Sequence, residues 1–169
     1  MTIATFTTPV LYDKIAQEIN TALSSKFDDQ YPVCWTRTEN DETVPEVYQN
    51  DGTKINLRVM PDKVRSMSFF TVESDLVELD EEDFACPMAL TCWVNLQDYD
   101  DSKEYDYTSE LIRDVYNVLK DYGCYDMNIN VNDPFEGFTM LEKEKQANIM
   151  RPLSAFKIAF SKNVAVCVP

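Results

Sequence analysis

The chain has 169 residues, of which 44% are hydrophobic and 12% aromatic, enough for one folded domain with its own core. It contains no run of about 18 apolar residues, so no transmembrane helix is expected. The first ten residues lack a basic residue and a long apolar core, so a secretory signal is not expected either. A net charge of −15 disfavours binding to nucleic-acid phosphates, which relies on Lys and Arg.

The first predicted element is a helix over residues 8–27. Thr8 can cap its N-terminus, and Pro9 suits the first helical position because the missing N–H of proline has no partner there. Apolar residues recur every three to four positions and form one stripe for the core, namely Leu11, Ile15, Ile19, Ala22 and Leu23. A short strand over residues 31–37 follows, and Pro32 places it at a sheet edge or near a strand start.

The middle of the chain predicts extended segments joined by polar turns. Residues 39–53 are polar and contain the turn signal Asn50-Asp51-Gly52. We expect this turn to join residues 54–60 in a hairpin with either 33–37 or 46–48. A further extended segment covers residues 67–78, and four acidic residues at 80–83 turn the chain into its longest strand.

That longest strand alternates strictly, with its apolar row at Cys86, Met88, Leu90, Cys92, Val94 and Leu96. Pro87 predicts that the N-terminal end of the strand lies at a sheet edge. Trp93 falls on the face opposite the apolar row. Because aromatic residues are enriched at protein contacts, Trp93 is a candidate interface residue, and ordinary packing under the second helix or in a second layer of the sheet is the alternative.

A second amphipathic helix is predicted over residues 109–122, with Leu111, Ile112, Val115, Tyr116, Val118, Leu119 and Tyr122 pointing inward. Gly123 is its expected C-terminal stop. A strand over 125–131 follows, residues 136–151 are either helix or a long loop with one helical turn, and Phe156, Ile158 and Phe160 alternate in a last strand. These elements predict one α+β domain over residues 1–169, with a mostly antiparallel sheet, a long amphipathic helix packed on it and an N-terminal helix.

The residue types exclude several classes of chemistry. The chain has no histidine, which excludes Ser-His-Asp and Cys-His arrangements, and its three glycines stand singly, so no phosphate-binding loop is present. Asp98, Asp100 and Ser102 begin like a calcium loop, but Lys103 stands where that loop needs its glycine. The five cysteines form no CxxC pair and are expected as buried thiols. We therefore expect no enzyme, no cofactor and no metal site.

Negative charge is concentrated in one part of the chain. Residues 75–106 contain eleven acidic residues and one basic residue, a net charge of −10 out of the total of −15. Solvated turns that keep the protein soluble are one interpretation. The other is a negative surface that does not bind DNA passing nearby, with Asp98, Asp100, Asp101 and Asp106 as the candidate residues.

The order of elements, with three local sequences, resembles the tail-terminator and tail-completion proteins of tailed bacteriophages and their neck-ring relatives. These sequences are the strand at 88–95, the helix at 111–122 closed by Gly123, and the proline-led last strand at 151–160. Few glycines and many Asp, Asn and Tyr residues would suit a phage of an AT-rich host, so the resemblance extends to the ring proteins of crAss-like phages.

The resemblance implies a homo-oligomeric ring, a hexamer or larger, assembled in the host cytoplasm and carried in the neck or tail of the virion. The ring would join the portal or connector of the capsid to tail proteins, and DNA would pass its lumen without specific binding. The family uses no cofactor, no catalytic residue and no membrane. Ring closure needs two different faces of the protomer, and we expect the strand at 33–37 or the strand containing Pro87 to supply an exposed edge. The alternative is an acidic adaptor or DNA-mimic inhibitor that binds a basic protein.

Overall fold

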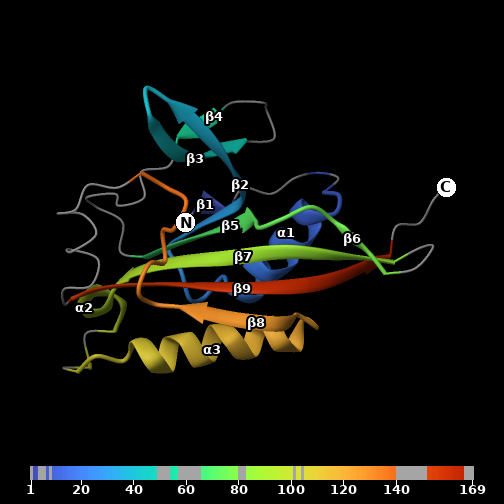
Figure 1. The fold of residues 1–169 in the computed structure, drawn as a ribbon. Helices are drawn as coiled ribbons and strands as arrows, with labels where there is room; N and C mark the ends of the chain where they lie inside the picture. Colours follow the sequence, from blue (N-terminus) through green and yellow to red (C-terminus); the bar gives the residue numbers. More distant parts are fainter. Residues whose placement is uncertain are drawn as a thin grey trace.

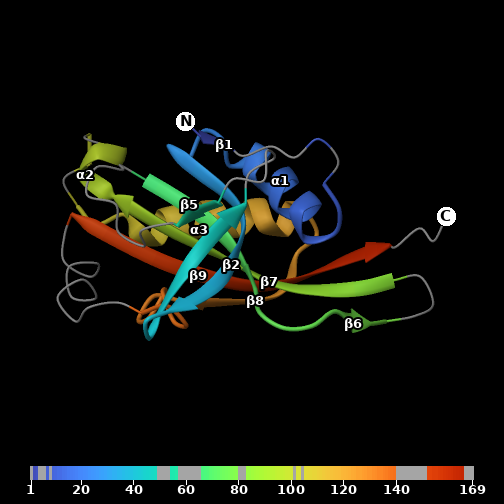
Figure 2. The same cartoon turned by 90° about the horizontal axis from the view of Figure 1, so that it is seen from above.

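The computed structural model describes residues 2–3, 7, 9–48, 54–56, 66–79, 83–100, 102–103, 105–139 and 152–165. The described residues form an α+β fold in which a mostly antiparallel sheet of nine strands carries two long helices (Figures 1 and 2), which confirms the predicted fold class. In chain order the elements are β1 (Thr2–Ile3), α1 (Tyr12–Ala22), β2 (Asp29–Glu39), β3 (Glu42–Tyr48), β4 (Lys54–Asn56), β5 (Ser66–Val72), β6 (Val77–Glu78), β7 (Asp83–Asn95), α2 (Leu96–Tyr99), α3 (Thr108–Asp121), β8 (Tyr125–Asn130) and β9 (Leu153–Ala165). Among the described residues, no helix is long and apolar enough to cross a membrane.

The two longest strands, β7 and β9, lie side by side and pair antiparallel along their full thirteen residues. The strand order is β4-β3-β2-β5-β7-β9-β8, with β1 added to β2 and β6 added to β7. Figure 2 shows β7 and β9 extending past α1 and α3 toward the C-terminus. The strands predicted from the rows 86–96 and 156–160 are therefore the longest pair of the sheet, although Leu96 begins α2 and does not belong to β7.

The main core lies between one face of the sheet and the helices α1 and α3. The predicted apolar row of β7 faces this core, and its members Cys86, Met88, Leu90, Cys92 and Val94 are all fully buried. The helix α3 contributes the buried residues Leu111, Val115 and Leu119 to the same core. Tyr122, which was predicted to point inward, is exposed instead, because the helix ends one residue before it.

The C-terminus of α3 has the geometry that Gly123 predicts. Gly123 adopts φ +73°, its N–H donates to the Lys120 carbonyl at 2.9 Å, and the N–H of Cys124 donates to the Leu119 carbonyl at 3.0 Å. These two bonds form a Schellman motif, which satisfies helix carbonyls that would otherwise lack a partner. The motif reverses the chain directly into β8, which pairs with β9.

A second, smaller cluster covers the opposite face of the sheet. Trp93 lies in it and is only 5% exposed, together with Cys34, Val47, Met67, Phe69, Phe135 and Ala155. Phe138 packs edge-on against Phe69 with ring centroids 5.8 Å apart. The turn after β8 therefore covers the face that alternation alone would leave to solvent, and Trp93 has an internal packing role.

The N-terminal helix is shorter than predicted. It begins at Tyr12 and ends at Ala22, and Leu11 precedes it with φ +46°. Pro9 is not helical, and Thr8 lies outside the described residues. The apolar stripe is correct where it falls on α1, since Ile15 and Ile19 are buried in the main core.

The first half of the sheet is a meander that the polar sequence only partly predicted. β3 pairs antiparallel with β4, so of the two partners left open by the sequence, residues 46–48 and not 33–37 pair with residues 54–56. Strands β2 and β3 form a second hairpin around Asn40 and Asp41, both at positive φ. This two-residue turn was missed within the segment 39–53. The predicted turn at Asn50-Asp51-Gly52 lies outside the described residues.

Of the two predicted edges, the strand that contains Pro87 is not one, because β7 lies between β9 on one side and β5 and β6 on the other. β2 lies between β3 and β5 in the strand order, but its pairing with β5 ends at Val33. From Cys34 onward it pairs only with β3 among the described strands, so one side of β2 is an edge there. β4 and β8 stand at the two ends of the main strand order of the described sheet. Pro87 is tolerated inside β7 because it falls between the residues paired with β6, which end at Ala85, and those paired with β5, which begin at Met88. Because neither β5 nor β6 pairs with β7 at Pro87, the missing N–H of this proline removes no hydrogen bond between strands on that side.

Candidate interaction surface

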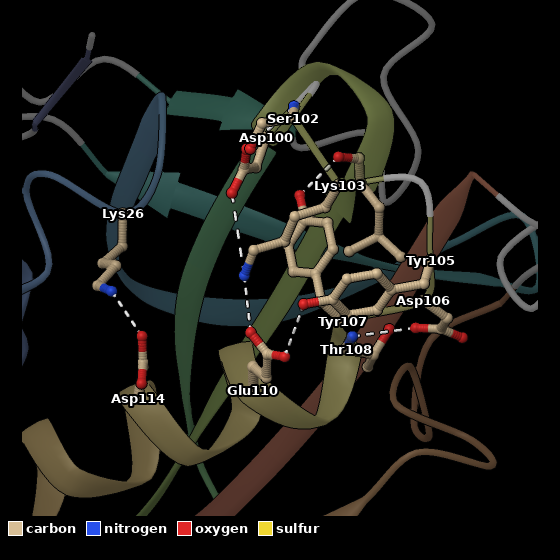
Figure 3. A network of polar contacts seen from close by, with 11 residues as sticks. Lys26, Asp100, Ser102, Lys103, Tyr105, Asp106, Tyr107, Thr108, Glu110 and Asp114 are labelled. Atoms are coloured by element: carbon tan, nitrogen blue, oxygen red, sulfur yellow. Dashed lines mark hydrogen bonds and ion pairs between the residues drawn. The ribbon is translucent and has the colours of Figure 1, made fainter.

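The turn between β7 and α3 contains the predicted acidic residues, of which Asp98, Asp100 and Asp106 are described. Local hydrogen bonds hold this turn, and Figure 3 shows those around Asp100, Lys103 and Asp106. Asn95 begins the turn, because its side chain accepts from the Gln97 N–H at 3.2 Å and caps α2. The same side chain donates to the exposed carboxylate of Asp98 at 2.8 Å. Asp98 thus occupies the first turn of α2, where a negative side chain is favoured by the helix dipole.

Asp100 and Asp106 accept hydrogen bonds from the backbone at two further points of this turn. The Asp100 carboxylate accepts from both the N–H and the hydroxyl of Ser102, and the hydroxyl bond is the largest reason why the pKa of Asp100 is lowered. Asp106 accepts from the N–H of Thr108, the first residue of α3, at 3.0 Å. Both carboxylates therefore have local structural roles, and the lowered pKa of Asp100 keeps that carboxylate ionised at neutral pH.

Lys103 is the cation at the centre of the turn. Its Nζ lies 2.7 Å from Glu110 Oε2, 3.9 Å from Asp100 Oδ2 and 4.6 Å from the centroid of the Tyr107 ring. Glu110 also accepts from the Tyr105 hydroxyl at 3.1 Å. The bond from Lys103 is the main cause that lowers the pKa of the Glu110 carboxyl, and the same bond raises the pKa of Lys103.

The structure brings Asp98, Asp100 and Asp106 together on one turn, while Asp101 lies outside the described residues. That the turn faces a lumen stays a prediction, as does a contact of Trp93 with another protomer. No pattern in the sequence indicated that Lys103 would offset part of the negative charge through Glu110. Such a pair seven residues apart, one member in a turn and one in a helix, has no fixed spacing that a pattern could reveal.

The acidic turn borders a cleft of about 460 Å³, which the segment between α1 and β2 also lines. The cleft is lined by Ser24, Ser25, Lys26, Phe27, Asp28, Ser66, Asp98, Tyr99 and Asp100. At its wall, Lys26 donates to Asp114 of α3 at 2.8 Å, and Ser66 donates to Asp28 at 3.0 Å. Carboxylates and hydroxyls dominate the lining, so the cleft suits a basic side chain of a partner.

The described residues offer little for catalysis. No group of three Cys, Asp or Glu side chains among them is placed to hold a metal ion. The four described thiols, Cys34, Cys86, Cys92 and Cys124, are buried and free. Burial raises the pKa of each, well above its usual range for Cys34 and Cys92 and to about 11 for Cys124. A reactive thiol needs a lowered pKa and access, so these cysteines are structural.

Comparison with known proteins gives one distant likeness. No protein-family model matches the chain, and neither does any curated protein. Among solved structures, the chain is similar to the sheath/tube terminator of an extracellular contractile injection system, PVC, in its extended state, with 11% identity and a TM-score of 0.31. The likeness covers 95% of this chain and 58% of that one, so the chain spans less than two-thirds of that terminator's length. A TM-score this low carries no argument about function.

Proposed function

We propose that the chain is a structural protein of a phage neck or tail that assembles into a homo-oligomeric ring. The observation that carries the proposal is the order of elements. An N-terminal helix precedes a long strand, followed by the helix α3 closed at Gly123, a strand directly after it, and a last strand led by a proline. This is the layout in which the sequence resembles tail-terminator and tail-completion proteins. In this role the ring joins the portal or connector to the tail.

The two edge strands support ring formation. A closed ring needs a heterologous interface, in which one face of a protomer contacts a different face of the next. The edges β4 and β8 lie at opposite ends of the described sheet, so they present two different surfaces. Ile129 on β8 and Val131 just after it are each 42% exposed, which gives that edge apolar area for a contact.

The acidic turn supports a lumen through which DNA passes without specific binding. A lumen lined with Lys and Arg would bind phosphates and slow the DNA. Asp98 and Asp106 are exposed, and their carboxylates stand on a turn held by its own hydrogen bonds. They can therefore remain at the surface after assembly without further partners.

Light scattering and negative-stain images of the purified protein, alone and with its portal or tail partner, test the ring. We expect rings with a central channel, formed by the protein alone or on the partner. A chain that stays monomeric in both settings contradicts the proposal.

Charge reversal tests the lumen. In the test variant, Asp98, Asp100 and Asp106 are replaced together by Lys. In the control variant, Lys replaces three exposed acidic residues elsewhere, namely Glu18, Asp121 and Glu136. Both variants change the net charge equally. We expect the first to assemble and to deliver the genome poorly, and the second to deliver it normally. If a turn variant assembles and still delivers the genome normally, the turn does not line the lumen.

The cleft of about 460 Å³ favours one second candidate, an acidic adaptor or DNA-mimic inhibitor of a basic protein. Its carboxylates Asp28, Asp98 and Asp100 would accept Lys or Arg side chains of that protein. A protein that remains monomeric and binds a basic host protein tightly, with loss of binding in an Asp28→Lys variant, would favour this candidate over the ring.

A further inference from the structure

Strands β2 and β5 separate partway along their length. They pair in parallel from Asp29 with Met67 to Val33 with Phe70, with a register shift on the way. From Cys34 onward β2 pairs with β3 instead, while β5 continues to Val72 beside β7. Figure 1 shows β2 leaving the main sheet toward β3 and β4. Among the described residues, no strand pairs with the β5-facing edge of β2 beyond Val33.

A groove of about 790 Å³ lies at this separation. One wall comes from β2, the other from the end of β5 and the segment after it, and Tyr12 of α1 lies at the base; the lining residues are Tyr12, Cys34, Trp35, Thr36, Thr71, Val72, Glu73, Ser74, Asp75 and Leu76. Trp35 is 50% exposed and Leu76 is 36% exposed. The volume is within the range of about 300–1,000 Å³ typical of ligand sites.

Backbone groups of both walls point into the groove. The Glu73 N–H donates to the Pro87 carbonyl of β7 at 3.1 Å. Because successive residues of a strand direct their backbone groups to opposite neighbours, those of Val72 face the groove. On β2, Thr36 stands opposite Pro45 of β3, which has no N–H to give. The pair of Thr36 and Pro45 therefore fits a non-hydrogen-bonded position of the antiparallel ladder between β2 and β3. At such a position the backbone N–H and C=O of Thr36 point away from β3.

Charge at the rim favours a basic occupant. Asp75 is exposed and lines the groove beside Glu73. The described cation at this rim is Lys157, whose Nζ already lies 3.0 Å from the Glu73 carboxylate. The groove therefore combines unpaired strand edges, apolar area at Trp35 and Leu76, and a net negative rim.

We propose that this groove binds an extended segment of another polypeptide, which adds as a strand between β2 and β5. Main-chain hydrogen bonds to Thr36 and Val72 supply affinity, as in other cases of strand addition. Apolar side chains of the segment contact Trp35 and Leu76, and a Lys or Arg of the segment pairs with Asp75. This site is separate from the acidic turn and does not depend on ring formation.

The test uses the full-length protein and a synthetic peptide, acetyl-Val-Lys-Val-Thr-Val-Lys-amide. Binding is followed by the fluorescence of Trp35, and amide resonances of Thr36 and Val72 locate it. We expect saturable binding below about 1 mM, and a loss of about tenfold or more in an Asp75→Lys variant. Asp121→Lys on α3, with the same charge change on an exposed residue, is the control and should bind as the wild type does.

Backbone methylation of the peptide tests the mode of binding. A strand held on both sides needs the N–H groups of both its edges, so N-methylation of either alternate set should abolish binding. The peptide with both Lys replaced by Asp should bind the wild type weakly and the Asp75→Lys variant better. The proposal is overturned if the first peptide does not bind at about 1 mM, or if both N-methylated forms and the Asp75→Lys variant bind unchanged.

Discussion

Replacing Gly123 with alanine is expected to destabilise the chain by about 2 kcal/mol. Gly123 has φ +73°, a backbone region that residues with a Cβ avoid. A Cβ there would lie 3.2 Å from Nζ of Lys162, which donates a hydrogen bond to the Tyr122 carbonyl at the end of α3. The alanine therefore strains the backbone and displaces the lysine from the carbonyl.

The two contributions can be estimated separately. The left-handed conformation costs an L-residue about 1–2 kcal/mol. Loss of the hydrogen bond from Lys162 adds about 0.5–1 kcal/mol, the low end of the usual range because the lysine is partly exposed to water. A total of about 2 kcal/mol lowers the Tm by roughly 4–8 °C for a chain of this size.

Urea unfolding followed by tryptophan fluorescence, with calorimetry for the Tm, measures the effect. Two control variants separate the causes. Lys162→Met removes only the hydrogen bond and should cost less than Gly123→Ala. Gly123→Asn should also cost less, because asparagine tolerates the left-handed region better than alanine. If the alanine variant lies within about 0.5 kcal/mol of the wild type, the argument from backbone strain is refuted.

Three further predictions concern the core and the acidic turn. Cys92→Ser puts a hydroxyl into the main core and should destabilise by about 1–3 kcal/mol, whereas Cys34→Ser should cost less, because the Cys34 thiol already donates to the Pro32 carbonyl at 3.8 Å; urea midpoints compare the two. The buried thiols should react slowly with a disulfide reagent at pH 8 in the folded protein and fast in urea, and equal rates in both would contradict their raised pKa values. Lys103→Met should raise the pKa of Glu110, which the hydrogen bond from Lys103 holds low. That lowered pKa stabilises the fold above the unfolded pKa of Glu, and the contribution is lost as pH falls through the folded pKa. The stability difference between wild type and variant should therefore be largest above about pH 4.5 and shrink in acid, and a difference independent of pH would be evidence against the pair.

The second half of the chain could be predicted well because its signals are local. Strict alternation in β7 and β9, the stripe of α3 and the glycine at position 123 each fix a structure within a few residues. The long strands and the helix between them could therefore be predicted from the sequence. The acidic turn could be predicted as well, because its residues are close together in the chain.

What could not be predicted depends on residues far apart in the chain. Trp93 is buried because Phe135 and Phe138, some forty positions later, fold over its face of the sheet. The order of the strands is also non-local, and so the interior strand β7 was taken for an edge. The hairpin at Asn40 and Asp41 did have a local signal, a pair of residues that tolerate positive φ. Charged and polar neighbours concealed it, since apolar alternation on either side was missing.

The groove between β2 and β5 shows the same limit at a candidate site. Its walls come from two strands whose parallel pairing ends at Val33 and Phe70, which no spacing in the sequence reveals. A site that forms where two strands diverge can be recognised only in the three-dimensional structure.

The central pairing of β7 with β9 has a consequence for how the protein folds. Its partners lie between 58 positions apart in the chain, at Asn95 and Leu153, and 82 positions apart, at Asp83 and Ala165. Such distant contacts must close a long loop before they contribute, and domains dominated by them fold in milliseconds to seconds. Until β9 arrives, the apolar β7 can be flanked only by β5 and β6. The nascent chain therefore presents an aggregation-prone strand during synthesis, and chaperone binding should raise its soluble yield.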